Sequence, residues 1–329
     1  MNLTKNTSDS DLVSVFLDAL RIRRVEEAIA KRYVEQKMRC PVHLSIGQEI
    51  PAAIMGKLKR DKDTFISSHR AHAHYLSSGG SLRKMIAEIY GKVDGCAQGR
   101  GGSMHLFDKE SGFLGSSAIV GNSIPVGVGL SYSNKIRKND AVSFVFFGDG
   151  ATEEGVFYES LNFAAIHKLP VFFVCENNKY SVYTGLVDRQ PLSRSICQVA
   201  ESLGVQSIMV SDFEVESAFE TAKKLLDDCR IGNGPKLIEI ETYRFLEHCG
   251  PNDDDNLSYR PIEELLHWKN QDRLMIFRNF LLNKGLFSEK LLIDMELFWQ
   301  NEIDDAFSFA EDSLFPTMND VLGHHFEKA

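Results

Sequence analysis

The central part of the chain alternates short apolar runs with segments whose apolar residues recur at helical spacing. Uninterrupted apolar runs of strand length predict strands that are buried on both faces of a sheet. The predicted strands lie near residues 141–147, 171–175, 205–210 and 236–241, with helices at 153–167 and near 213–230 between them. Strands that alternate with helices in this way indicate an α/β fold, in which a parallel sheet is flanked by helices.

Helical patterns also occupy both ends of the chain. Residues 11–37 predict an amphipathic helix, because apolar residues recur at helical spacings from Leu12 to Ile29. Residues 63–120 predict short helices separated by glycine-rich loops, and residues 261–312 predict further helices, one of them capped by Ser288. No internal repeat or long linker divides the sequence. We therefore expect one domain over residues 1–329, with a core at about 15–310 and helical N- and C-terminal extensions.

The composition is that of an ordinary globular protein, with 43% hydrophobic and 25% charged residues. A net charge of −9 argues against a sequence-independent binder of nucleic acid. The N-terminus is polar where a signal peptide needs an apolar centre, and no apolar stretch is long enough to span a bilayer. The six cysteines show no Cys-x-x-Cys spacing, which fits a reducing compartment. We expect a cytoplasmic protein with no nucleic-acid partner and no membrane partner.

The most informative motif is Gly148-Asp149-Gly150 after one buried strand, with Asn177-Asn178 after the next strand. Both motifs should lie at the carboxyl edge of the sheet, where open α/β sheets bind their ligands. The glycines let the backbone approach a phosphate, but the Asp149 carboxylate would repel a diphosphate unless a divalent cation lay between them. Since Mg²⁺ prefers carboxylate, carbonyl and phosphate oxygens, the sequence predicts a magnesium–diphosphate site here.

The predicted metal ligands are the carboxylate of Asp149, the amide oxygen of Asn178 and the backbone carbonyl of Tyr180. Gly150 and Ala151 are expected to begin the next helix, so that their N–H groups and the helix dipole face the diphosphate. Each motif alone is weak, because an Asn pair usually marks a turn, but the combination is far more specific. A nicotinamide-binding fingerprint would need glycine where the chain has Glu153, and no Gly-x-x-x-x-Gly-Lys-Ser/Thr string occurs.

A resemblance to a known family covers nearly the whole chain. The two motifs resemble the thiamine diphosphate signature, and further strings resemble the alpha subunit of the first component of 2-oxo acid dehydrogenase complexes, especially the pyruvate and acetoin types. These strings run in family order and are Ser68-His69-Arg70-Ala71-His72, Gly99-Arg100-Gly101-Gly102-Ser103-Met104-His105, Ile119-Val120-Gly121 leading to Pro125, Leu169-Pro170, Cys175-Glu176-Asn177-Asn178-Lys179-Tyr180, Thr242-Tyr243-Arg244, His248 and Ser258-Tyr259-Arg260.

The resemblance implies thiamine diphosphate and Mg²⁺ as cofactors. The implied reaction is oxidative decarboxylation of a 2-oxo acid, above all pyruvate, with transfer of the acyl group to a lipoyl carrier. Activating this cofactor needs a carboxylate beside its aminopyrimidine ring, normally from a second α/β domain for which this chain has no room. The resemblance therefore implies the diphosphate-binding half alone, and a beta subunit that supplies the pyrimidine-binding domain and the activating glutamate in an α₂β₂ heterotetramer. A lipoyl acyltransferase is a further expected partner.

The resemblance also implies roles for residues outside the two motifs. Arg70 is expected to contact the end of the diphosphate, a task suited to its forked, permanently charged donors. His69, which is often tyrosine in pyruvate-type relatives, is expected to donate a hydrogen bond to phosphate with some sensitivity to pH. Ala118 and Val120 are expected to hold the aminopyrimidine through backbone groups.

His69, His72 and His74 lie close in sequence, but their spacings match no common zinc pattern and no cysteine is near. The resemblance instead implies that His72 lines the active centre, and His74 is expected to be structural. His248 is expected to bind at the cofactor and to move protons near the reacting centre, the alternative being an ordinary histidine of a surface loop.

The chain departs from the family pattern beside His248. Leu246 and Cys249 stand where pyruvate-type relatives carry a second histidine and a regulatory serine, so phosphorylation is not expected there. The three carboxylates of residues 253–255 are expected to face solvent or to pair with a base such as Arg260. Glu176 stands where branched-chain members carry arginine, which disfavours a branched-chain substrate.

Two other functions stay open beside the decarboxylation of pyruvate. The same cofactor could serve acetoin cleavage, or a carbon–carbon ligase or lyase of a specialised biosynthetic pathway. The chain could also be a non-catalytic partner that binds the cofactor only structurally. The intact set of Asp149, Asn178 and His248 argues against that last function.

Overall fold

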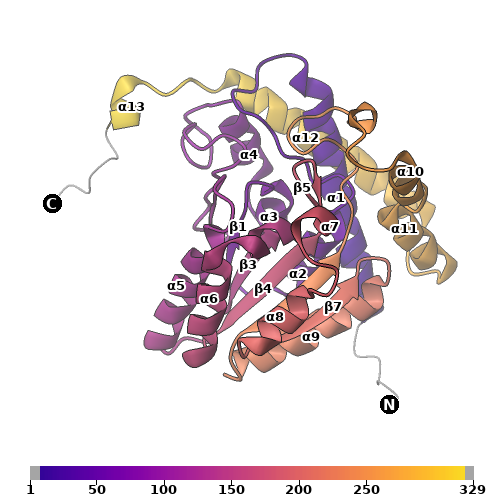
Figure 1. Ribbon diagram of the computed structural model, residues 1–329. Helices are drawn as coiled ribbons and strands as arrows, with labels where there is room; N and C mark the ends of the chain where they lie inside the picture. The colour runs from indigo at the N-terminus through magenta and orange to yellow at the C-terminus, as the bar shows by residue number, and fades with distance from the viewer. Residues whose placement is uncertain (1–7, 323–329) are drawn as a thin grey trace.

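The computed structural model of the protein describes residues 8–322, which are built around one six-stranded sheet (Figure 1). All strands of this sheet pair in parallel, in the order β2-β1-β3-β4-β8-β7. The strands are β1 (Thr64–Ser67), β2 (Phe113–Ser116), β3 (Ser143–Gly148), β4 (Val171–Asn177), β7 (Gln206–Ser211) and β8 (Lys236–Glu241). A separate short hairpin pairs β5 (Tyr180–Ser181) with β6 (Thr184–Gly185). The predicted α/β fold with a parallel sheet is confirmed.

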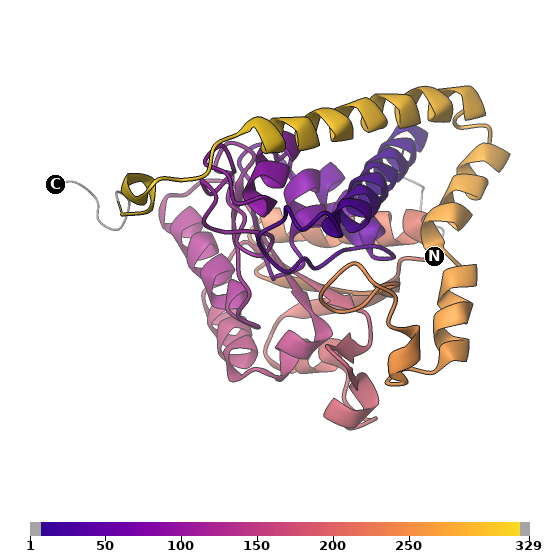
Figure 2. The ribbon, with the colours of Figure 1, turned by 90° about the horizontal axis from the view of Figure 1, so that it is seen from above.

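Helices cover both faces of the sheet, as a parallel sheet requires. The helices are α1 (Asp9–Tyr33), α2 (Glu49–Leu58), α3 (His72–Ser77), α4 (Leu82–Ile89), α5 (Ser123–Ile136), α6 (Gly155–Ile166), α7 (Leu186–Arg189), α8 (Ile196–Ser202), α9 (Val215–Arg230), α10 (Ile262–Asn270), α11 (Arg273–Asn283), α12 (Glu289–Asp312) and α13 (Met318–Leu322). Figures 1 and 2 both show α5 and α6 together on one side of the sheet, away from α1 and α12. Among the described residues, none of these helices combines the length and the apolar character that crossing a bilayer requires.

Successive residues of the central strands point to opposite faces and so fill two hydrophobic cores. In β3, Phe144 and Phe146 belong to the larger core, formed with α1 to α4 and α9 to α12. Val145 and Phe147, which alternate with them, belong to the smaller core under α5, α6 and α8. Both faces of β3 are therefore apolar, which explains why its sequence reads as a continuous apolar run.

The helices at the two ends of the chain form an outer layer over the larger core. Figure 2 shows α12 running along the outside of α1. Ion pairs join the two helices, between Arg24 and Glu296 at 2.7 Å and between Arg21 and Glu302 at 2.5 Å. The predicted helical extensions thus pack on each other as well as on the core.

The strand order creates a switch point between β1 and β3. From β1 the chain moves outward to β2, and it then returns to place β3 on the other side of β1. Connections that leave adjacent strands in opposite directions open a crevice at their carboxyl ends, where ligands of doubly wound sheets bind. Residues 68–70 follow β1, and Asp149 and Gly150 follow Gly148, the last residue of β3, so both segments lie at this crevice.

Some predicted elements differ from the structure at their ends. The helix expected over 153–167 begins at Gly155, because Asp149–Glu153 forms a separate 3₁₀ turn. The N-terminal helix ends at Tyr33, before residue 37. Strands β1 and β2 were not predicted, because each has only four residues and lies between glycine-rich loops.

Replacing a side chain at the centre of the sheet should destabilise the protein strongly. Phe173 of β4 is 0% exposed, so Phe173→Ala is expected to lower the free energy of unfolding by about 3–5 kcal/mol. The matched control Phe298→Ala, on the exposed side of α12, should change that free energy by less than about 0.5 kcal/mol. Chemical unfolding followed by tryptophan fluorescence measures both, and equal effects would contradict the assignment of the core.

Candidate active site

One cavity lies at the switch point and collects most of the predicted site residues. Its volume is about 170 Å³. It is lined by His43, Gln48, Ser68, His69, Arg70, Met104, Ala118, Val120, Gly121, Phe147, Gly148, Asp149, Gly150, Ala151, Glu176, Asn178, Tyr180, Ser181, Val182 and His248. Residues as far apart in sequence as His43 and His248 therefore meet at the carboxyl edge of the sheet, as the two motifs predicted.

Asp149 follows β3 directly, and its side chain is almost fully buried. Burial raises the pKa of this carboxyl, because the charged form loses its hydration, while the guanidinium of Arg189 acts in the opposite direction. Arg189, at the end of α7, donates a hydrogen bond to Asp149 and another to Glu153. The carboxylate predicted to bind a metal ion is thus held beside a positive charge of the chain itself.

Asn178 lies at the neighbouring strand end, because β3 and β4 pair in parallel up to Gly148 and Glu176. Its amide oxygen accepts a hydrogen bond from the backbone N–H of Tyr180 at 3.0 Å. Its amide nitrogen donates to Oε1 of Gln48, the N-cap residue of α2, at 3.1 Å. Asn178 therefore shapes the turn after β4, and the N–H of Tyr180, which can only donate, fixes which side of the amide carries the oxygen.

The glycines beside Asp149 leave room for a ligand at the backbone. A side chain at Gly148 would meet only one atom within 4 Å, the Glu176 carbonyl oxygen at 3.9 Å, whereas a side chain at Gly150 would collide with Ser181. Gly150 and Ala151 line the cavity within the 3₁₀ turn. The expectation that these two residues begin the long helix is wrong, because α6 starts at Gly155 after the extended residue Glu154. The N–H groups at this edge thus belong to a short turn.

Arg70 is buried at the base of the cavity and holds two loops together. Its guanidinium donates to the backbone carbonyl of Leu44 at 2.5 Å and to the backbone carbonyl of His248 at 3.1 Å. Burial lowers the pKa of this guanidinium to about 9, with a further contribution from the charge of Arg244. Arg70 thus carries positive charge into the cavity and fixes the loop that presents His248.

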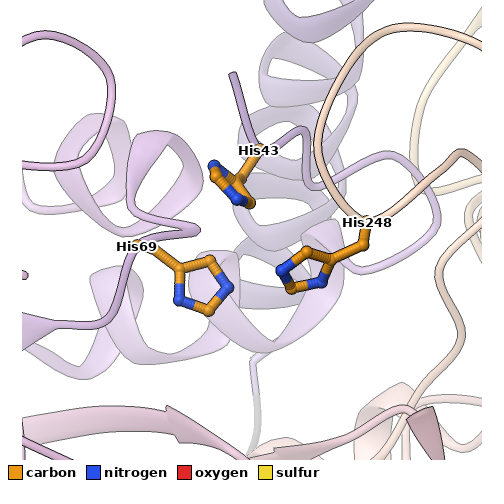
Figure 3. A group of neighbouring side chains, drawn as sticks. All are labelled: His43, His69 and His248. Atoms are coloured by element: carbon orange, nitrogen blue, oxygen red, sulfur yellow. The ribbon is translucent and has the colours of Figure 1, made fainter. Parts of the chain in front are cut away.

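His43, His69 and His248 come from three separate loops and meet in the lining of the cavity (Figure 3). Their ring centroids lie 4.7 to 5.2 Å apart, and the rings are tilted or edge-on to one another. Burial lowers the pKa of His248 to about 3 and that of His69 to about 4, and the charge of Arg70 adds to both shifts. Burial and the same charge lower the pKa of His43 to about 2. All three imidazoles are therefore neutral at pH 7, so His248 can accept a proton but does not carry one in advance.

A family model described as "Dehydrogenase E1 component" matches residues 18–319 of this sequence. The chain belongs to this dehydrogenase E1 component family. Its resemblance to the alpha subunit of such enzymes, inferred from the motifs, is thereby confirmed.

Similar proteins from bacteria and plants support the same membership. One is the pyruvate dehydrogenase E1 component subunit alpha of Rickettsia felis, which is 34% identical over 306 residues that cover 93% of each chain. The protein of that name from Rhizobium meliloti is 33% identical over 315 residues, covering 95% of this chain and 89% of the relative. The mitochondrial protein of that name from Pisum sativum is 34% identical over 323 residues, covering 98% of this chain and 80% of the relative.

Two histidines of this E1 chain are occupied by structural hydrogen bonds. His72 is fully buried, and its ring bonds to Glu26 at 2.9 Å and to Ser103 at 2.8 Å. It does not line the cavity, so the expectation that it lines the active centre is corrected, because both ring nitrogens are used inside the core. His74 bonds to Ser67 and to Glu176, which agrees with the structural role expected for it.

The acidic loop after His248 is neutralised within the E1 chain. Asp254 is buried and pairs with Arg260, as the sequence predicted. Asp253 and Asp255 both lie near the ammonium of Lys269, at 3.1 and 3.4 Å. Among the described residues, none of these three carboxylates lines the cavity.

Three residues of the site carried no recognisable signal in the sequence. His43 and Gln48 lie in the loop between α1 and α2 and at the start of α2, and Arg189 lies on a helix of four residues. None of them belongs to a spaced motif. Only the fold brings His43 to His69 and His248. It likewise brings Gln48 to Asn178 and Arg189 to Asp149. A long-range contact of this kind leaves no local pattern in a single sequence.

The neutral histidine cluster should make the protein less stable in acid. An imidazole kept neutral by folding takes up its proton only on unfolding, so acid favours the unfolded state below the usual histidine pKa of about 6.5. The free energy of unfolding should therefore decrease when the pH falls from 7.5 to 5.5. His43→Asn removes one such group, so this decrease should be about 1.4 kcal/mol smaller in the variant than in the parent protein. Urea unfolding at both pH values measures the difference, and identical losses would show that folding does not lower the pKa of His43.

Proposed function

We propose that this chain is the alpha subunit of a thiamine diphosphate-dependent enzyme that oxidatively decarboxylates a 2-oxo acid, with pyruvate as the preferred substrate, and passes the acyl group to a lipoyl carrier. One observation supports this most directly. Asp149 and Asn178 line the same cavity, at the switch point of a parallel sheet in an E1 family member. The relatives named above are pyruvate dehydrogenase alpha subunits, which supports pyruvate.

The residues around the cavity fit a magnesium diphosphate. The buried carboxylate of Asp149 is paired with the guanidinium of Arg189. If Mg²⁺ took the place of that guanidinium, the negative charge of Asp149 would still be compensated. The amide oxygen of Asn178 and the backbone carbonyl of Tyr180 supply neutral oxygens of the kind that Mg²⁺ accepts. Gly148 leaves room for a phosphate oxygen, and Arg70 brings positive charge from the side of β1.

Each of the other site residues has a task that its position allows. When bound, thiamine diphosphate supplies an electron sink that stabilises the carbanion left by decarboxylation. Ala118 and Val120 also line the cavity, and they would hold the aminopyrimidine through backbone groups. His69 would donate to phosphate from its neutral ring. His248, also neutral, would accept a proton near the reacting carbon and return it later in the cycle.

A beta subunit would complete the site in an α₂β₂ enzyme. The cavity of about 170 Å³ is smaller than the roughly 300–1,000 Å³ of complete small-molecule sites, as expected if this chain forms one wall. Ile119 and Val120, at the rim, are 67% and 46% exposed although both are apolar, so a second protein surface would stabilise them. That subunit would contribute the pyrimidine-binding domain and the activating glutamate.

Co-expression of both subunits tests the proposed reaction. The purified assembly is expected to reduce an artificial electron acceptor with pyruvate faster than with acetoin or branched-chain 2-oxo acids, and to acylate a lipoyl domain. Acetoin as the best substrate would favour the alternative of acetoin cleavage. Cofactor binding without turnover of any of these substrates would contradict the proposal.

Asp149→Ala should abolish magnesium-dependent binding of the cofactor, because it removes the buried carboxylate that lies between Gly148 and Gly150 at the cavity. Calorimetric titration of the assembled enzyme with thiamine diphosphate and Mg²⁺ measures the affinity. The control Glu153→Ala removes the other carboxylate bound by Arg189, which lies outside the cavity lining, and should keep the affinity. Unchanged affinity in Asp149→Ala would refute the metal assignment.

His248→Ala should slow reductive acylation by about 10²–10⁴, the usual effect of losing a general acid–base group. Cofactor affinity should stay within a few-fold, since Arg70 and Asp149 remain. Single-turnover kinetics with a lipoyl domain separate the two effects, with His105→Ala, at an exposed position outside the cavity, as control. If His248→Ala acylated the lipoyl domain as fast as the parent enzyme, His248 would be an ordinary histidine of a surface loop with no role in proton transfer.

A further inference from the structure

The three histidines His43, His69 and His248 come from loops that are far apart in sequence. His43 precedes α2, His69 follows β1 and His248 follows β8. One ligand nitrogen of each lies within 4.8 Å of the corresponding nitrogens of the other two. Figure 3 shows the three rings around a common space, with a nitrogen of each ring directed toward it. This trio differs from the sequence neighbours His69, His72 and His74, of which two are fully occupied by hydrogen bonds.

The lone pairs of the trio are not used inside the protein. His43 is 6% exposed, and its Nδ1 is buried with no hydrogen-bond partner, which is costly for a polar atom. Among the described residues, neither the His69 ring nor the His248 ring takes part in a hydrogen bond. An imidazole with a buried, unpartnered nitrogen lies against two further imidazoles whose rings make no hydrogen bond in the described part of the chain, and such a group calls for a common partner.

The donor atoms of the trio suit a metal ion. Three neutral nitrogens with an open fourth position form the donor set of several catalytic zinc centres. Hard cations such as Mg²⁺ prefer oxygen ligands and would not choose this set.

We propose that His43, His69 and His248 form a tris-histidine site for a borderline transition-metal ion of the Zn²⁺ class, with its open position toward the cavity. The site is separate from the oxygen ligands Asp149 and Asn178, and it goes beyond the proposed function. It selects Zn²⁺, Co²⁺, Ni²⁺ or Cu²⁺ over Mg²⁺ through its nitrogen donors.

Geometry and charge set the strength of this site. Zinc–nitrogen bonds of about 2.0–2.1 Å in a tetrahedron place the nitrogens roughly 3.4 Å apart, so nitrogens that lie up to 4.8 Å apart must approach by as much as about 1.4 Å. The rings sit on loops, and each closes by small rotations of its side chain. Arg70 opposes the metal by its positive charge, so the site binds an exchangeable ion and not a permanent structural one. If His248 moves protons as proposed above, the bound metal takes its lone pair and inhibits the enzyme.

Titration of the full-length chain with Co²⁺ tests the site without cofactor or substrate, so its failure is distinguishable from failure of the proposed function. His324 and His325, which lie outside the described residues, are first replaced by glutamine, because an adjacent histidine pair can bind metal by itself. The intense visible absorption of four-coordinate Co²⁺ is expected, saturating at one equivalent and displaced by Zn²⁺ but not by excess Mg²⁺.

Single variants connect that signal to the trio. His43→Asn and His69→Phe should each abolish the visible band, whereas His105→Gln, at an exposed position, should leave it unchanged. Circular dichroism verifies that the variants fold. Absence of the band in the parent chain, or its persistence in both variants, overturns the proposal.

X-ray absorption of the Zn²⁺ form gives a test that needs no variant. Three imidazole ligands are expected in the first coordination sphere. A sphere dominated by carboxylate oxygens, or one with fewer than two imidazoles, overturns the proposal even if the variants fail to fold.

Discussion

The carboxylate of Asp149 is buried at the end of a central strand, where it must be compensated by positive charge. Its position follows from the sheet: β3 is apolar on both faces, so the chain meets solvent and ligands only where the strand ends. In this structure Arg189 provides the compensation from α7. In the proposed enzyme Mg²⁺ provides the compensating charge instead, so the guanidinium of Arg189 must move away from Asp149 when the cofactor binds.

A second buried charge organises the opposite wall. Arg70 enters from β1, and its bonds to the carbonyls of Leu44 and His248 join loops that are distant in sequence. Burial lowers the pKa of each histidine of the trio, and the charge of Arg70 adds to that shift. One buried guanidinium thus fixes the loop that carries His248 and also favours the neutral form of its ring, which is how a fold prepares a site before a ligand arrives.

The sequence predicted the features that depend on local patterns. The apolar runs that became β3 and β4, and the pair of motifs at their ends, were identified because a buried strand and a tight polar turn each leave a local pattern. The short strands β1 and β2 left too little pattern to predict. His72 resembled an active-site residue in sequence, but Glu26 and Ser103, distant in the chain, hold it in the core. His43 and Arg189 reach the site only through tertiary contacts, which a single sequence does not encode locally.

The most direct test is a crystal structure of the assembled enzyme with thiamine diphosphate and Mn²⁺ in place of Mg²⁺, with the metal located by its anomalous scattering. The account predicts one peak at roughly 2.0–2.2 Å from side-chain oxygens of Asp149 and Asn178, with the Arg189 guanidinium moved off Asp149. A metal peak elsewhere, with the pair between Arg189 and Asp149 intact and the diphosphate outside the crevice between β1 and β3, would contradict it.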